Sequence, residues 1–334
     1  MVPAWLWALT VGIIVLLITF EFVQATRNPH EVHVREATVQ SIVYIGIAIA
    51  YGVFFAWWSA DQPQPEGSSY GMEYFAGWLI EKSLSVDNLF VFVIIMSTFA
   101  VPKIYQQKVL MAGIAGALVL RTIFIFLGAA ALGTFAFTYV IFGAFLIYTA
   151  FGLAKHRNED PEFNEGKLVK LAKRILPFTD EYHGAHLHTR IDGKRHGTPL
   201  LLVMIAIFAT DIIFALDSIP AVYGVTDEPF IVFAANAFAL LGLRALYFLV
   251  AGLLDKLVYL SLGLAVILAF IGVKLILVFF GVHIGIWVSL GFIIGILAIT
   301  TIASLIKVRR DPSAVAHAGA IPGFESKRTK GETD

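Results

Sequence analysis

The chain has 334 residues, of which 58% are hydrophobic and only 14% charged, and its mean hydropathy is +0.81. An average soluble domain has about 25% charged residues, so these values exclude that class and indicate an integral membrane protein. The formal net charge of zero gives no indication of nucleic-acid binding. The absence of cysteine excludes disulfides, thiolate chemistry and cysteine metal sites, and leaves oxygen and imidazole as the metal ligands to consider.

Nine segments are apolar and long enough, or nearly so, to cross a bilayer, which takes about 20 residues of helix. They are 5–24, 38–58, 74–100, 109–132, 139–154, 199–222, 230–254, 258–280 and 285–307. A cleavable signal peptide is the alternative for the first segment, but that segment lacks a basic start and contains Glu21. We expect an all-α polytopic membrane protein: a membrane domain over residues 1–310, with a cytoplasmic loop at 155–198, and a flexible cytoplasmic tail over 311–334.

The loops differ in charge from one side of the predicted membrane to the other. All but four of the 24 Lys and Arg residues fall in loops that lie on one side or in the tail. The opposite side has none of them and carries only acids, namely Asp61, Glu66, Glu73, Asp227 and Glu228. Because basic loops stay in the cytoplasm, the N-terminus is predicted outside and the C-terminus inside.

Ionisable residues also occur within the apolar segments. The basic ones are Lys82, Arg121, Arg244 and Lys274, and the acids are Glu81, Asp87, Asp211 and Asp217, with Glu21 near the end of the first segment. Eight such residues facing lipid would cost on the order of 20 kcal/mol. They must therefore face one another or a watery cavity, and we expect a functional site, although ion pairs that only hold helices together are the alternative.

An internal repeat relates the two motifs that contain these acids. "EKSLSVDN" (81–88) and "DIIFALDS" (211–218) share an acid, five residues, an acid and then an amide or hydroxyl. The next segment in each half has a Leu-Arg pair, and the one after has a Tyr and two Gly at matching spacing. Segments three to five therefore recur as six to eight. Since three is an odd number, the second copy is inverted, as in secondary transporters with a site near the midplane.

Oxygen atoms dominate the residues that the two motifs contribute. The predicted metal site consists of Glu81, Asp87, Asn88, Asp211, Asp217 and Ser218, with Ser85 nearby and with Lys82, Arg121, Arg244 and Lys274 as supporting charges. Such a ligand set suits Mg²⁺, Mn²⁺ or Ca²⁺. The two acids of one motif lie about 120° apart on a straight helix, so they converge only if a helix unwinds or several helices surround the site. Pro220 favours a break beside Asp217.

The same residues resemble a known family. "EKSLSVDN" followed by "LFVF", together with "LRTIFIFLGA", "DIIFALDSIPAV" and "GLRALYFL", is similar to the TerC/Alx family of bacterial membrane proteins, within a wider group of LysE-like transporters. This resemblance covers residues 38 to about 307. It implies an inner-membrane exporter of divalent metals, with manganese the favoured substrate, and it implies that the four motif acids bind the metal. Tellurite, after which the family is named, is an anion and does not suit an acidic site.

The leading interpretation is a secondary transporter that exports Mn²⁺ as its substrate, with protons as a candidate counter-ion and with no cofactor required. One alternative is an exporter of a small cationic solute, as in lysine exporters. Another is a non-transporting scaffold of a metal or tellurite stress complex. An enzyme is disfavoured because no nucleophile motif or phosphate loop occurs in the sequence. The expected partners are the metal ion and the lipid bilayer, with no nucleic acid.

Two weaker features remain. His156, His183, His186, His188 and His196 lie in the long cytoplasmic loop, where a metal-sensing patch is conceivable but an incidental cluster in a solvated loop is favoured. Glycines at 281, 285, 291 and 295 have the spacing of close helix packing or of a homodimer contact, and packing within the chain is favoured. The lone His283 on the outer side is an exit ligand or, more commonly for such a residue, part of a polar loop.

Overall fold

The computed structural model describes residues 2–27, 34–64, 69–155, 169, 174, 176–179, 182, 184, 186–191, 194–250 and 258–311. Within these ranges the side chains of Asp87 and Asp217, among a few others, lie outside the description. The described chain is almost entirely helical. The expectation of an all-α polytopic membrane protein is confirmed, whereas the tail at 311–334 falls almost wholly outside the described residues.

Apolar sequence and length make most of the helices long enough to cross a membrane. The helices are α1 (Ala4–Arg27), α2 (Val34–Ser59), α3 (Tyr70–Thr98), α4 (Lys103–Thr134), α5 (Thr138–Lys155), α7 (Pro199–Tyr223), α8 (Pro229–Leu240), α9 (Leu243–Val250), α10 (Leu260–Phe279) and α11 (Ile286–Arg310). Among the described residues, seven of them qualify as candidate membrane spans by length and composition: α1, α2, α4, α5, α7, α10 and α11. The predicted count of nine is therefore not reached on this criterion.

The two remaining predicted segments have different forms. Segment 74–100 is the continuous 29-residue helix α3, which contains the charged motif at 81–88. Segment 230–254 is interrupted: α8 ends at Leu240, Gly242 has a φ of +73°, and α9 begins at Leu243. Glycine accepts this positive φ without the strain that a side chain would add. The interruption lies between Asn236 and Arg244, and the sequence motifs did not predict it.

The predicted break beside Asp217 is not observed. Helix α7 runs from Pro199 to Tyr223 with Pro220 inside it. Proline removes one backbone hydrogen bond and crowds the preceding turn. Here α7 stays helical through the turn before Pro220 and to Tyr223, and the Gly224 amide donates to the Pro220 carbonyl. The unwound element thus belongs to α8–α9 and not to the second acidic motif.

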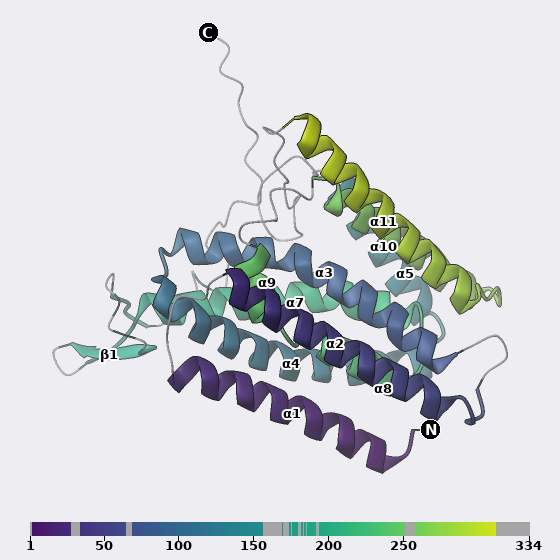
Figure 1. Ribbon diagram of the computed structural model, residues 1–334, viewed down its shortest axis with the longest axis horizontal. Helices are drawn as coiled ribbons and strands as arrows, with labels where there is room; N and C mark the ends of the chain where they lie inside the picture. Colours follow the sequence, from purple (N-terminus) through teal and green to yellow (C-terminus); the bar gives the residue numbers. More distant parts are fainter. Residues whose placement is uncertain are drawn as a thin grey trace, which may run out of the picture.

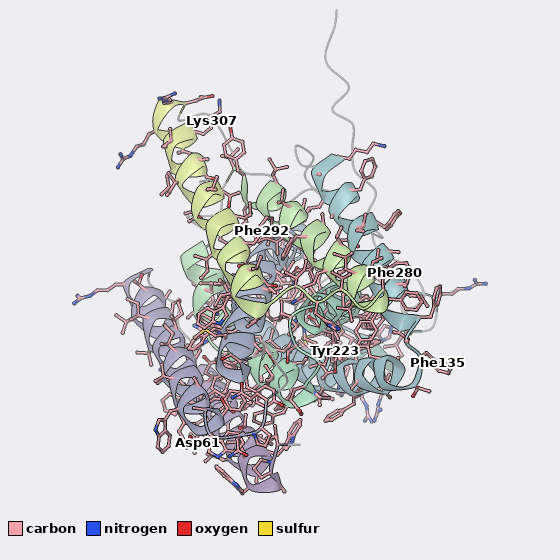
Figure 2. The ribbon with its side chains drawn as sticks, turned by 90° about the vertical axis from the view of Figure 1, so that its right-hand side faces the viewer. Asp61, Phe135, Tyr223, Phe280, Phe292 and Lys307 are labelled. Carbon is pink, nitrogen blue, oxygen red and sulfur yellow. The ribbon has the colours of Figure 1, made fainter. Side chains whose placement is uncertain are left out.

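The helices form two groups (Figure 1). Helices α1, α2, α3 and α4 run side by side, with α7, α8 and α9 among them, whereas α5, α10 and α11 lie together at an angle to the first group. Figure 2 shows α11 running from Lys307 at the upper left, past Phe292, to the middle of the view. Helices α5 and α10 cross closely at Gly143 and Gly272, where a Cβ on Gly143 would lie 2.5 Å from the Gly272 carbonyl oxygen.

A short antiparallel hairpin lies in the long loop before α7. Strand β1 (His188–Ile191) pairs with β2 (Lys194–Gly197), with His188 opposite Gly197. The sequence predicted only a loop in this region. The Thr198 hydroxyl donates to the His186 carbonyl at 2.7 Å, which ties the hairpin to the start of α7.

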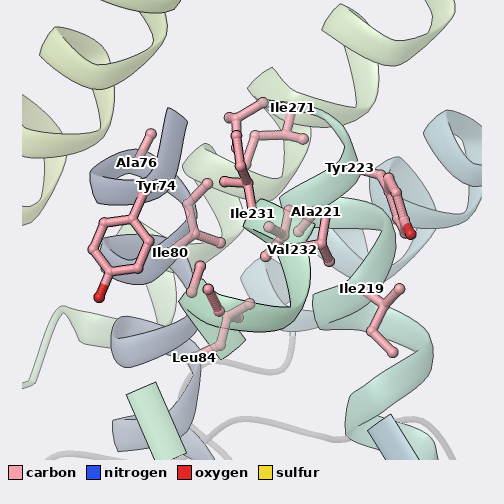
Figure 3. Close-up of a cluster of buried hydrophobic side chains, with 14 of the residues drawn as sticks. Tyr74, Ala76, Ile80, Leu84, Ile219, Ala221, Tyr223, Ile231, Val232 and Ile271 are labelled. Atoms are coloured by element: carbon pink, nitrogen blue, oxygen red, sulfur yellow. The ribbon is translucent and has the colours of Figure 1, made fainter. Parts of the chain in front are cut away.

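Helices α3 and α7 pack in antiparallel order and form the centre of the molecule. Thr226, just beyond α7, bonds to Glu73 in the first turn of α3, and Val222 packs on Gly77 one turn further along. Figure 3 shows the apolar cluster around this contact, with Ile80 on α3, Ala221 on α7 and Val232 on α8. The two motif-bearing helices are thus adjacent. Whether the two halves are an inverted repeat stays a prediction.

Candidate cation site

One arginine joins the first acids of the two motifs. The Arg121 guanidinium of α4 forms an ion pair with Glu81 of α3 through Nη1 and with Asp211 of α7, whose Oδ1 lies 3.2 Å from Nη2 and 3.4 Å from Nε. Nη1 also donates to the Ser218 hydroxyl at 3.3 Å. All four residues are at most 2% exposed. We call these four residues the Arg121 cluster.

Close packing of α4 on α7 delivers Arg121 to this position. A Cβ on Gly116 would lie 2.0 Å from the Phe208 ring, and one on Gly113 would lie 3.0 Å from Ile207. These glycines let the two helices approach closely in the turns before Arg121. Its long side chain then reaches between α3 and α7, where its charge offsets the desolvation of both carboxylates.

Several buried oxygen atoms beside Arg121 have no hydrogen-bond partner among the described residues. They are Glu81 Oε2, Asp211 Oδ2 and the Ser85 hydroxyl oxygen. A small cavity of about 10 Å³ adjoins two of these groups and is lined by Ser85, Asn88, Arg121 and Asp211 among others. This is room for about one water. Unpaired acceptors in a low-dielectric interior are costly, and a cation or a water in this cavity would satisfy those of Ser85 and Asp211.

The structure brings together some of the predicted site residues and leaves others undescribed. Glu81, Asp211 and Ser218 meet at Arg121, and Asn88 lines the adjoining cavity. The side chains of Asp87 and Asp217 are outside the described residues, so their place in the site stays a prediction. In the described part of the chain, no three His, Asp or Glu side chains are grouped closely enough to hold a metal ion.

Lys82 binds the helix interruption and not a carboxylate. Its ammonium donates to the carbonyl oxygens of Ala239, at 3.1 Å, and Leu241, at 3.4 Å. These carbonyls belong to the end of α8, whose amide partners are missing because the helix stops there. A cation at a helix C-terminus also opposes the negative end of the helix dipole. Lys82 therefore stabilises the α8–α9 junction.

Arg244 points to the two N-terminal helices. Its guanidinium donates to Gln40 of α2 at 3.1 Å and to Gln24 of α1 at 3.5 Å. The buried Glu21 of α1 lies within electrostatic range of Arg244 and Lys82. This second polar cluster attaches α1 and α2 to the core. Arg244 was predicted as a supporting charge of the metal site, whereas its hydrogen bonds go to Gln24 and Gln40. Contacts between segments so far apart in the chain leave no local pattern.

Lys274 lines a much larger cavity, of about 570 Å³, at the Tyr70 end of α3. Its ammonium donates to the Ser289 hydroxyl at 3.1 Å. Acids face the same cavity: Glu73 accepts a 2.6 Å bond from the Thr226 hydroxyl, and Asp227 accepts a 3.0 Å bond from the Tyr139 hydroxyl. His283 and Glu228 are also part of the wall. The sequence pattern indicated these acids only as loop charges that set the orientation.

The histidines of the long loop are described only in part. His186 and His188 are exposed, and His196 lies in β2. His156 and His183 lie outside the described residues.

The four glycines at 281, 285, 291 and 295 were expected to pack closely within the chain, and this expectation is wrong for the described residues. A Cβ on any of the four would meet no atom within 4 Å. The alternative, a homodimer contact, stays a prediction.

Comparison with known proteins decides the family. The family model described as "Integral membrane protein TerC family" matches residues 66–312, which include both motifs, the Arg121 cluster and the large cavity. The chain belongs to the TerC family. Membership confirms the resemblance drawn from the motifs, and it agrees with the multi-pass membrane fold.

Relatives of this TerC protein cover most of its length. An uncharacterized membrane protein of Myxococcus xanthus is 42% identical over 313 residues, 94% of this chain and 96% of the relative. An uncharacterized membrane protein of Mycobacterium tuberculosis is 49% identical over 275 residues, 81% of this chain and 68% of its own. The provisionally named membrane-bound redox modulator Alx of Escherichia coli O157:H7 is 39% identical over 314 residues, 93% and 97% of the two chains. No solved structure matches.

Proposed function

We propose that this TerC protein is a secondary transporter that exports divalent metal ions, with Mn²⁺ the favoured substrate, across the cytoplasmic membrane. The observation that carries the proposal is the Arg121 cluster: two buried carboxylates from different helices converge, and each keeps an oxygen without a partner among the described residues. Carboxylate, amide and hydroxyl oxygens are the ligands of hard cations such as Mn²⁺, Mg²⁺ and Ca²⁺.

The cluster has the position that a transport site requires. Glu81 is the twelfth residue of the 29-residue helix α3, and Asp211 is the thirteenth of the 25-residue helix α7. Both are therefore close to mid-membrane if the helices span it. Ionisable residues at that depth mark ion pathways. The antiparallel packing of α3 on α7 is also the order that an inverted repeat predicts for the first helices of its two halves.

Asp87 and Asp217 complete the proposed ligand set, together with Asn88 and Ser218. Lys82, Arg244 and Lys274 act at a distance, through the helix junction, the N-terminal helices and the large cavity respectively. Arg121 balances two carboxylates until a divalent cation takes its place between them. Protons that exchange with the metal on the acids would provide the counter-ion. In this scheme the metal is the substrate, and the protein needs no resident cofactor.

The orientation proposed for the chain places the N-terminus outside and the C-terminus in the cytoplasm. It rests on the basic loops, since the ends of α1, α5 and α11 carry Arg27, Lys155 and Arg310, whereas Asp61, Asp227 and Glu228 lie at the opposite ends of the helices. The large cavity then opens to the outside. An exporter in a bacterial inner membrane would release its ion there.

Two other functions were weighed. A small cationic solute would use the same acids, but the cavity beside Arg121 is about 10 Å³, far below the volume of an amino acid. A scaffold of a stress complex would not need buried oxygen atoms that lack partners. The Alx relatives are named for redox modulation. This chain has no cysteine, so a redox effect through its own thiols is excluded, and supply or removal of a metal is the simpler route.

Transport by the purified protein tests the proposal. Proteoliposomes loaded with a divalent-sensitive dye would be exposed to Mn²⁺, Ca²⁺ or Mg²⁺ with and without a pH gradient, and radiolabelled lysine uptake would be measured in parallel. We expect Mn²⁺ flux that a pH gradient alters and no lysine flux. Lysine flux without metal flux would favour the solute exporter, and no flux of any kind would favour the scaffold.

A further inference from the structure

The large cavity at the Tyr70 end of α3 and the Arg121 cluster are connected by one helix. A role for this cavity in the route of the substrate rests on the proposed function. Three positions on α3, Glu73, Gly77 and Glu81, are each four residues apart, so each is turned only about 40° from the one before and the three lie along one side of the helix. They span about 12 Å along the helix axis.

Three contacts connect this face of α3 with α7 in sequence. Thr226 donates to Glu73 at the wall of the large cavity. One turn inward, Gly77 packs on Val222, and a Cβ on Gly77 would lie 2.9 Å from Val222 Cγ1 and 3.3 Å from Ala235. Another turn inward, Glu81 and Ser218 share Arg121 Nη1. About two helical turns of α3 thus separate Glu73 at the cavity wall from Glu81 in the cluster, with the contact between Gly77 and Val222 midway between them.

At the opposite end of the same helix pair, the described side chains between α3 and α7 are apolar and tightly packed. Phe92 and Met96 of α3 and Val203 and Ile207 of α7 are 4%, 1%, 0% and 1% exposed, and they belong to one apolar cluster. This apolar cluster is two helical turns deep on each helix. Among the described residues, access to the Arg121 cluster along α3 and α7 is therefore shorter from the Tyr70 end than through the packed apolar end.

The chemistry of the large cavity suits a hydrated cation. Six waters occupy roughly 180 Å³, so a cavity of 570 Å³ holds a fully hydrated divalent ion. Three carboxylates, from Glu73, Asp227 and Glu228, face one ammonium, from Lys274. The C-terminal end of α7 also points its partly negative carbonyls towards this region.

We propose that this cavity is the outer vestibule of the transport route, that Glu73 binds the divalent cation there, and that the contact between Gly77 and Val222 is the gate between vestibule and Arg121 cluster. Glu73 is the appropriate residue because it is 6% exposed and on the same helix face as Glu81. An ion that passes Gly77 would move from Glu73 to Glu81 along a single face of α3. The narrow gate admits an ion only when α3 and α7 separate at Gly77.

The cysteine-free chain makes a direct test possible. Single cysteines would be placed at Val225 in the vestibule wall, at Val203 in the packed apolar end and at the exposed Asp61 as a control. A charged thiol reagent that does not cross membranes would be applied to each face of sealed vesicles. We expect Val225→Cys and Asp61→Cys to react from the same face and Val203→Cys to react from neither.

Mn²⁺ provides the ligand test. With Mn²⁺ at about ten times its half-effective concentration, labelling of Val225→Cys should slow about tenfold, as occupancy of a single site requires. Labelling of Asp61→Cys should not change, and Glu73→Gln should abolish the protection. An unreactive Val225→Cys beside a reactive Asp61→Cys would overturn the vestibule, and protection that survives Glu73→Gln would overturn the role of Glu73.

The gate is tested by adding side-chain volume at Gly77 and then removing it at Val222. Gly77→Ala should stop most Mn²⁺ flux while Val225→Cys in the same background still labels, which shows that the fold is intact. Val222→Ala added to Gly77→Ala should restore flux, because it removes the methyl groups that the new Cβ meets. Normal flux in Gly77→Ala, or no recovery in the double variant, would contradict the gate. Labelling does not depend on transport, so the two proposals can fail separately. Protection of Val225→Cys by Mn²⁺ without Mn²⁺ flux would reject the transporter and keep the Glu73 site. Mn²⁺ flux without this protection would keep the transporter and reject the Glu73 site.

Discussion

Glu81 and Asp211, 130 positions apart in the sequence, are bound by the same guanidinium, that of Arg121. Each carboxylate lies in a helix that would otherwise be an ordinary apolar segment. Desolvating three charges is tolerable only because they neutralise one another in part and because Ser218 adds a hydrogen bond. The net charge of the cluster is still negative, which makes the exchange of Arg121 for a divalent cation electrostatically reasonable.

Without Arg121, the carboxylates of Glu81 and Asp211 should repel each other, because no positive charge remains between them. We expect Arg121→Met to lower the free energy of unfolding by about 3–5 kcal/mol, the usual cost of breaking a buried ion pair. Added Mn²⁺ should recover part of this loss, because it supplies the missing positive charge, and a chelator should reverse the recovery. Thermal unfolding in detergent measures both effects, with Arg35→Met, at an exposed position, as the control. A melting temperature of Arg121→Met that Mn²⁺ does not raise would argue against cation binding in the cluster.

Lys82 should matter for stability through the helix interruption. In Lys82→Met the carbonyls of Ala239 and Leu241 lose the ammonium that they accept from. A buried acceptor without its donor costs about 1–3 kcal/mol. Thermal unfolding should show this loss, whereas Lys155→Met, at the exposed end of α5, should change little. Equal stability of the two variants would mean that the α8–α9 junction does not need Lys82.

The crossing of α5 and α10 gives a test of packing with a control on the same helix. A Cβ on Gly143 would lie 2.5 Å from a backbone oxygen of Gly272, which cannot rotate away. Gly143→Ala should therefore destabilise the protein by about 1–3 kcal/mol, the usual cost of overpacking. Gly152→Ala meets no atom within 4 Å and should be neutral or slightly stabilising, since alanine is the better helix former. Thermal unfolding that ranks the two variants the other way would contradict the crossing.

Local patterns in the sequence predicted the helices and the charged motifs well. They did not predict which side chains of different helices contact each other. Glu81 and Asp211 were identified because a charge within an apolar helix is costly and needs a reason. That they share Arg121 depends on the close approach of α4 to α7 at Gly116, which no local pattern reveals. The helix break was expected at Pro220, but α7 stays helical past Pro220 to Tyr223, and the break occurs at Gly242, which has a positive φ.

The vestibule was missed for a related reason. Glu73, Asp227 and Glu228 appeared in the sequence as acids of outer loops and served only to set the orientation. Glu73 is nearly buried because the first turn of α3 packs against Thr226 after α7. Its position four and eight residues before Gly77 and Glu81 was the available signal.

The second acid of each motif gives a prediction that depends on the sequence alone. Asp87→Asn and Asp217→Asn should each reduce Mn²⁺ efflux at least about tenfold, which equals about 1.4 kcal/mol of lost stabilisation of the bound ion. Efflux from Mn²⁺-loaded cells measures this, with protein levels in the membrane compared in the same samples. Wild-type efflux in both variants would remove these two residues from the site and leave the Arg121 cluster to act without them.

The central claim is that the carboxylates at Arg121 carry the transported ion, and the most direct test is Mn²⁺ flux into proteoliposomes containing wild type, Glu81→Gln, Asp211→Asn or, as a control, Asp61→Asn. Each amide preserves shape and removes one negative charge. We predict that Glu81→Gln and Asp211→Asn are folded but lose most of the flux, while Asp61→Asn transports like wild type. Undiminished flux in both folded cluster variants would contradict the claim.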